Sequence, residues 1–144
     1  MADDSPEAIV ARWYEEAWHR GNLDVFDELY APDWVGHLPQ GLELRGPAAH
    51  KQFGQVFGAA FPDGRYEVEE TLVAGDRVVT RYTFRGTHQG PLRGLPATGR
   101  AVALTGITIQ RLAGGRIAEQ WAEYDMVGLL QQLGAIPAPG HPAG

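Results

Sequence analysis

Acidic side chains recur along residues 116–125, where apolar and polar residues alternate as they do in a β-strand. One face of a regular strand here would carry Ile117, Glu119, Trp121, Glu123 and Asp125. A carboxylate beside apolar groups is a stronger base than one in water, so this face suits general acid–base chemistry. Asp125 stands where the strand gives way to an apolar helix beginning at Met126. It could carry a proton or simply cap that helix.

Two histidines lie in stretches that could place them beside such a carboxylate. His37 belongs to a short strand-like segment, residues 34–38, and His88 begins a Gly/Pro-rich loop, residues 87–100. Either imidazole could hold a substrate carbonyl or donate to the enolate oxygen formed when a neighbouring carbon loses a proton. Each could equally be a histidine bonded within a wall or a loop. We assign no role to His19, His50 or His141.

Large aromatic side chains supply candidate walls for a ligand pocket. They are Tyr14, Trp18, Trp34, Phe53, Phe57, Tyr82 and Trp121. Each alone is more often part of a core, but together they suit a flat, aromatic or terpenoid-sized ligand. Arg81, a charge in an apolar strand, either faces solvent or pairs with Glu119 or Glu123. Arg81 and Glu123 are therefore candidate substrate-binding residues as well.

The elements that must position these residues are helices first and strands afterwards. A hydroxyl cap and a proline at residues 5–6 begin a helix that ends at Gly21, a shorter helix follows, and Pro47 opens a third. The alternating pattern then predicts long strands at residues 66–73, 77–87, 100–111 and 116–125. This order predicts an α+β fold with helices on one face of a curved antiparallel sheet. Periodicity alone leaves a cone and a flat sandwich both open.

Composition excludes several classes of protein and site. The net charge is −6 and the 12 Lys and Arg residues are scattered, so we expect neither a nucleic-acid nor a membrane partner. With no cysteine there is no thiolate site, and without a signal-like N-terminus or a long apolar run we expect a cytoplasmic protein. His37, His88 and Asp125 could form a facial metal triad, but no His-x-His or Glu-x-x-His spacing supports one, so we expect no metal.

Four stretches of the chain look familiar together. They are AWHRGNLDVFDELYAPDWVGHLP (17–39), FPDGRYEVEE (61–70), RGTHQGPLRGLPATGR (85–100) and GGRIAEQWAEYDMVGLLQQLG (114–134). On these motifs the chain resembles the SnoaL-like polyketide cyclases and ester cyclases of the nuclear transport factor 2-like superfamily. The third and fourth stretches are the more specific to that group.

The resemblance implies a cone-shaped, NTF2-like α+β domain over residues 1–136, followed by a flexible tail at residues 137–144. It implies a deep pocket for an apolar carbonyl substrate and a homodimer formed through the outer face of the sheet. A pocket aspartate, here Asp125, would remove a proton next to a carbonyl. The enolate would then close a ring by intramolecular aldol attack, with no metal or organic cofactor.

Two other functions remain open. One is epoxide hydrolysis of the limonene epoxide hydrolase type, for which Asp125, Glu119 or Glu123, and Arg81 supply the residue types. The other is a non-catalytic ligand-binding protein, which a pocket closed by bulky side chains would favour. An Asp125 that points outward, or is solvated and bonded only to the backbone of the next helix, would overturn both enzyme assignments.

Overall fold

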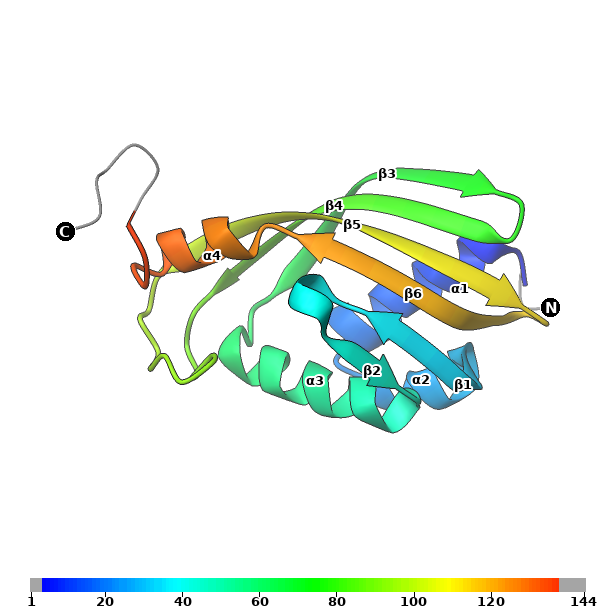
Figure 1. Ribbon diagram of the computed structural model, residues 1–144, viewed down its shortest axis with the longest axis horizontal. Helices are drawn as coiled ribbons and strands as arrows, with labels where there is room; N and C mark the ends of the chain where they lie inside the picture. The colour runs from blue at the N-terminus through cyan, green and yellow to red at the C-terminus, as the bar shows by residue number, and fades with distance from the viewer. Residues whose placement is uncertain (1–3, 138–144) are drawn as a thin grey trace.

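The structure is a computed structural model that describes residues 4–137 (Figure 1). Its helical elements are α1 (Pro6–Arg12), the π-helix η1 (Trp13–His19), the 3-10 helix η2 (Leu23–Val25), α2 (Phe26–Leu29), the 3-10 segment η3 (Pro39–Gly41), α3 (Pro47–Ala60) and α4 (Met126–Gln132). Its strands are β1 (Tyr30–His37), β2 (Glu43–Arg45), β3 (Arg65–Ala74), β4 (Arg77–Thr87), β5 (Ala101–Ala113) and β6 (Arg116–Tyr124). Residues 138–144 of the predicted tail lie outside the described residues.

The first helix begins as the sequence predicts and then widens. The Ser5 hydroxyl accepts a hydrogen bond from the Ala8 N–H at 3.2 Å, which caps the first turn of α1. From Trp13 onward the segment is a π-helix, in which hydrogen bonds join residues five apart. Trp13 and Trp18 therefore lie on neighbouring turns, and their rings meet edge to face at 5.6 Å.

The six strands form one curved sheet in the order β2-β1-β6-β5-β4-β3. β1 runs parallel to β6, and all other neighbouring pairs are antiparallel. The sheet bends over α1, α2 and α3, while α4 follows the end of β6 (Figure 1). The predicted α+β fold with a curved sheet is confirmed, and a flat sandwich is excluded.

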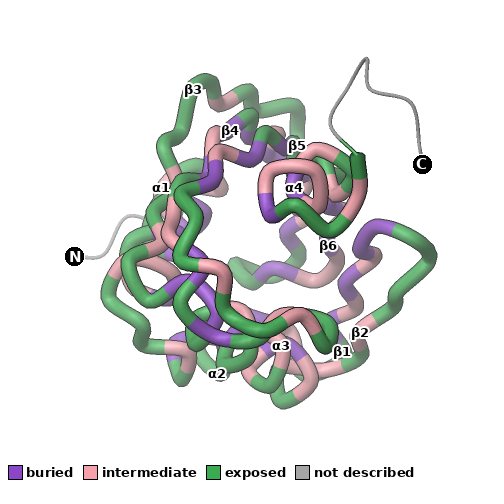
Figure 2. The backbone as a smooth tube through the Cα atoms, turned by 90° about the vertical axis from the view of Figure 1, so that its left-hand side faces the viewer, coloured by how far each residue is buried: buried purple, intermediate pink, exposed green. Residues whose placement is uncertain are grey.

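The buried side chains form two clusters between the sheet and the helices. One, which includes Trp13, Phe26 and Trp34, joins the N-terminal helices to β1 and β6. The other, which includes Phe84 and Leu129, lies toward α4 and the loop between β4 and β5, the end that faces the viewer in Figure 2. No helix within residues 4–137 is long and apolar enough to span a membrane.

Candidate active site

Two small cavities lie between the sheet and the helices, and Phe53 and Tyr124 line both. The inner cavity, of about 30 Å³, is lined by Trp13, Trp18, Leu38, His50, Phe53, Tyr66, Tyr82, Thr108, Gln120, Ala122 and Tyr124. The mouth cavity, of about 50 Å³, is lined by Phe53, Val56, Phe57, Leu92, Arg93, Tyr124, Met126 and Leu129. Ligand pockets usually measure roughly 300–1,000 Å³. Bulky side chains therefore close both cavities, which is the arrangement expected of the non-catalytic alternative. A polyketide-sized ligand enters only if the cavity walls move apart.

A chain of buried hydrogen bonds ends at the wall of the inner cavity. The indole Nε1–H of Trp13 donates to the Tyr30 hydroxyl at 2.7 Å, and that hydroxyl lies 2.7 Å from Nδ1 of His50. An indole N–H can only donate, so the Tyr30 oxygen accepts from Trp13 and its own proton points to His50. Among the described residues His50 Nδ1 is the one acceptor bonded to that buried hydroxyl, so we assign Nδ1 as the acceptor and place the proton of a neutral His50 on Nε2.

The surroundings of His50 keep its imidazole neutral. Its ring and that of Tyr30 lie nearly in one plane, and both stack on Phe26 and on Trp34, with His50 4.8 Å from each of those two rings. The side chain is 2% exposed, and burial lowers the pKa of His50 to about 3. Among the described residues, Nε2 has no hydrogen-bond partner. His50, a residue that lines the inner cavity, therefore has one neutral N–H group without a partner in the described part of the chain.

The other polar groups around the inner cavity are also uncharged. Gln110 donates from Nε2 to Oε1 of Gln120 at 3.2 Å, and both amides are buried on the inner face of the sheet. Nε1 of Trp18 is buried without a partner in the described part of the chain. No carboxylate is among the described residues that line either cavity. The interior can thus hold and polarise a carbonyl group, but it offers no acidic side chain as a base.

Asp125 lies outside both cavities. It is exposed at the N-cap of α4, where its Oδ1 accepts a hydrogen bond from the Gly128 N–H at 2.8 Å. With Arg81 and Glu123 it borders an open surface pocket of about 490 Å³. This is the solvated, helix-capping placement, so it counts against Asp125 as a buried base and against both enzyme assignments as far as they depend on Asp125. Its catalytic role stays a prediction.

A β-bulge in β6 explains why the acidic face does not line the interior. Arg111 of β5 pairs with Glu119, but the next residue, Leu112, pairs with Ile117. Ala118 is therefore the extra residue, which shifts the alternation by one. Ile117 is fully buried, whereas Trp121 is half-buried and Glu123 exposed on the outer face. The prediction that Ile117 shares one face with Trp121 and the acids is wrong for this reason.

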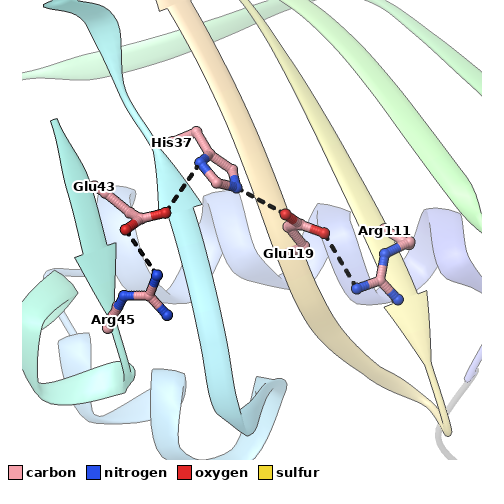
Figure 3. A network of polar contacts seen from close by, with 5 residues as sticks. All are labelled: His37, Glu43, Arg45, Arg111 and Glu119. Carbon is pink, nitrogen blue, oxygen red and sulfur yellow. Dashed lines mark hydrogen bonds and ion pairs between the residues drawn. The ribbon is translucent and has the colours of Figure 1, made fainter. Parts of the chain in front are cut away.

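His37 also lies on the outer face, within a polar network that crosses four strands (Figure 3). Its Nε2 donates to Glu119 Oε2 at 2.7 Å, and its Nδ1 lies 3.6 Å from Glu43 Oε1. At one end of the network, Nη2 of Arg111 lies 3.3 Å from Glu119 Oε1. At the other end, Nη2 of Arg45 lies 2.9 Å from Glu43 Oε2. The hydrogen bond from His37 lowers the pKa of Glu119. His37 therefore does not face the cavities, and its ring stacks on Trp121 instead, at 5.6 Å.

His88 is fully buried and holds the loop that follows β4. Its Nδ1 accepts hydrogen bonds from the backbone N–H and the hydroxyl of Thr98, at 3.1 and 3.0 Å. Its backbone N–H and carbonyl bond Arg100 and Gly99. His88 lines neither cavity, so the structure gives it the loop-fixing position and leaves its proposed donor role a prediction.

The structure divides the other predicted binding residues among several places. Trp18, Phe53 and Tyr82 line the inner cavity, and Phe53 and Phe57 line the mouth cavity. Trp34 stacks behind His50. Tyr14 is buried beside a separate groove under α1, where burial raises its pKa to about 12. Arg81 is exposed on the outer face and pairs with Glu70 at 3.3 Å, so it pairs with neither Glu119 nor Glu123.

Sequence reasoning missed the most distinctive group of the interior. The sequence analysis assigns no role to His50 and does not single out Tyr30. The signal that could have found His50 is its spacing, because it lies three residues before Phe53 and seven before Phe57, on the apolar stripe of α3. A histidine on such a stripe is either a core residue or a pocket residue.

Comparison with known proteins finds similarity to polyketide cyclases, both by family profile and by individual relatives. The profile of the SnoaL-like polyketide cyclases matches residues 8–133. Aklanonic acid methyl ester cyclase of Streptomyces sp. strain C5 is 30% identical over 133 residues, which span 90% of this chain and 83% of that relative.

Two solved structures show the same fold. A SnoaL-like polyketide cyclase assigned in Jannaschia sp. CCS1 has a TM-score of 0.85 and 27% identity, covering 92% of this chain and 93% of its own. IdmH from Streptomyces antibioticus, assigned as a polyketide cyclase, has a TM-score of 0.79 and 37% identity, covering 90% and 99%.

Proposed function

The chain belongs to the SnoaL-like polyketide cyclase family, and from this premise we propose that it cyclises or isomerises an apolar, polyketide-like carbonyl compound without a cofactor. The observation that carries the proposal is the buried, neutral His50, which lines an aromatic cavity and whose Nδ1 is bonded to Tyr30. No carboxylate is among the described residues that line this cavity. The inner cavity thus joins an apolar body-binding surface to one fixed hydrogen-bond donor.

His50 would act on the oxygen of the reacting carbonyl. When a proton leaves the carbon next to that carbonyl, negative charge moves onto the oxygen, and a preorganised donor stabilises it. A neutral imidazole donates without giving up its proton, and the Tyr30 hydroxyl and Trp13 N–H behind it keep it in this tautomer. The resulting enolate carbon then attacks a second carbonyl of the same molecule, which forms the carbon–carbon bond of the ring and breaks the π bond of that carbonyl. The alkoxide formed takes up a proton and becomes the ring hydroxyl, so no net proton is lost.

The group that takes the carbon-bound proton is a separate part of the proposal. We retain Asp125 for this role because it follows Tyr124, which lines both cavities, and because the resemblance in sequence assigns it. As an exposed carboxylate it is a weak base, so it could serve only a carbon acid that the substrate itself activates. The two parts can fail independently.

Screening polyketide and terpenoid carbonyl compounds by quenching of tryptophan fluorescence would identify a ligand, and chromatography would detect ring closure. For a substrate found in this way, His50→Phe keeps an aromatic ring in the stack but removes the donor. Loss of one such donor typically lowers kcat by about 10²–10³-fold. His37→Phe, on the outer face, is the matched control and should leave kcat unchanged. An unchanged kcat in His50→Phe would refute the role of His50.

Epoxide opening is a second candidate because Arg81, Glu123 and Asp125 border one open pocket. Carboxylates and an arginine are the groups that activate and orient a water molecule. Against this, Arg81 is already paired with Glu70. Conversion of limonene oxide to its diol, abolished by Asp125→Asn but not by His50→Phe, would favour this function over ring closure.

Homodimerisation through the outer face of the sheet also stays a proposal. Leu72 and Ile107 are about half exposed, at 55% and 46%, and each pairs with an outward-facing residue of β4. Sedimentation of the wild type and of Ile107→Lys would test it, since a charge at the centre of that face should dissociate the dimer.

A further inference from the structure

Two tight turns at the mouth of the pocket share an uncommon backbone conformation. Arg93 and Gly94 form the tip between Leu92 and Leu95, whose backbones exchange hydrogen bonds of 3.0 and 2.8 Å. Both tip residues have positive φ, 50° and 77°. This is the pattern of a type I′ turn, whose first central position usually holds Asn, Asp or Gly rather than a long side chain.

A second turn, in η3, repeats this pair of positive φ angles. Gln40 and Gly41 in η3 have φ of 65° and 74°, and the Leu38 N–H donates to the Leu42 carbonyl at 2.8 Å. Gln40 and Arg93 are the only non-glycine residues with positive φ in the described part of the chain. Strained positions of this kind concentrate at functional sites and ligand clamps.

The two long side chains meet each other. Nη1 of Arg93 donates to Oε1 of Gln40 at 2.9 Å, which links segments 53 residues apart. Arg93 also lines the mouth cavity beside Phe53, Phe57 and Tyr124. This hydrogen bond thus joins η3 to the β4–β5 loop at the mouth cavity.

Arg93 is the one charged residue among the described residues that line the mouth cavity. Unlike most other arginines of the described chain, it has no acidic partner. Its side-chain hydrogen bond is to a neutral amide, and no acidic partner lies within ion-pair distance among the described residues. By contrast, Arg81 and Arg85 on the outer face each pair with a glutamate. The positive charge of Arg93 also acts on Tyr124, which lines both cavities. Burial raises the pKa of Tyr124, and the charge of Arg93 partly offsets that rise.

We propose that Arg93 binds a carboxylate carried by the ligand, with the apolar body of that ligand in the cavities below. In the free protein Gln40 Oε1 occupies the position of one carboxylate oxygen. A carboxylate offers the guanidinium a charged, bidentate acceptor in place of a neutral one, so exchange is favourable and releases the contact across the mouth. The inference rests on the proposed function in that the interior must accept the ligand body.

A matched pair of planar probes tests this inference: anthraquinone-2-carboxylate and its methyl ester. Binding is measured by tryptophan fluorescence for the wild type, Arg93→Gln and the control Arg85→Gln, which removes the same charge from the outer face. We expect the wild type to bind the carboxylate about 10-fold more tightly than the ester, as for one hydrogen bond to a charged group. Arg93→Gln should abolish that preference, while Arg85→Gln should retain it.

The outcomes separate the two proposals. Equal binding of both probes to the wild type, or equal weakening of both in Arg93→Gln, would overturn the role of Arg93 while leaving an interior ligand site in place. Failure of both probes to bind the wild type would overturn the interior site and this inference with it. Because Arg93 is exposed, a melting temperature close to that of the wild type is the expected check that Arg93→Gln folds.

Discussion

The buried, neutral His50 should make the protein sensitive to acid. In the unfolded chain the pKa of this histidine is near 6.5, whereas burial lowers it to about 3 in the folded protein. Between these values only the unfolded state binds the proton, so unfolding becomes easier as the pH falls. Relative to pH 7.5, the free energy of unfolding falls by about 1 kcal/mol at pH 5.5 and by about 3 kcal/mol at pH 4.5.

Urea unfolding of the wild type and of His50→Gln at these three pH values measures the effect. The amide of the variant can still accept from Tyr30 but does not titrate. The difference in unfolding free energy between the two proteins should therefore shrink on acidification by the amounts above. His37→Gln is the control and should leave the acid loss in place. Parallel pH profiles for wild type and His50→Gln would refute a buried, neutral His50.

Three further predictions follow from named contacts. Tyr30→Phe leaves Trp13 Nε1–H and His50 Nδ1 without their partner. Urea titrations should therefore show the unfolding free energy to fall by about 2–4 kcal/mol. A loss below about 0.5 kcal/mol would contradict the hydrogen-bond chain. Asp125→Asn keeps a capping oxygen and should change the unfolding free energy by less than about 0.5 kcal/mol, whereas Asp125→Ala should lower it by about 1 kcal/mol. Full activity in Asp125→Asn would show that Asp125 is not the proton carrier. Gln40→Gly puts glycine at a backbone position with positive φ and should not lower the melting temperature. A lower melting temperature would show that the hydrogen bond from Arg93 to Gln40 stabilises the protein more than the backbone strain destabilises it.

The fold was largely predictable because its signals are local. The Ser5 cap, the helix at Pro47 and the alternation from Arg65 onward each depend on a few neighbouring residues. Together they specify helices on one side of a long-stranded antiparallel sheet, and the structure confirms this. The π-helical turn after Trp13 was not predicted, because its apolar stripe is compatible with an ordinary helix.

The candidate site was less predictable because one extra residue in a strand changes which of its side chains face the interior. Ala118 looks like any other residue of the alternating pattern, yet the bulge there turns Trp121 and Glu123 to the outside. His50 gains its significance only from Tyr30, Phe26 and Trp34, which belong to other elements. Such contacts between distant segments are not written in the spacing of any one stretch.

We propose that the interior beside His50, rather than the outer-face pocket beside Asp125, receives the substrate. A crystal structure with a bound polyketide carbonyl compound tests this placement. We expect a carbonyl oxygen within about 2.7–3.2 Å of His50 Nε2, with the side chains around Phe53 and Tyr124 moved apart. A ligand bound between Arg81, Glu123 and Asp125, with the interior still closed, would contradict it.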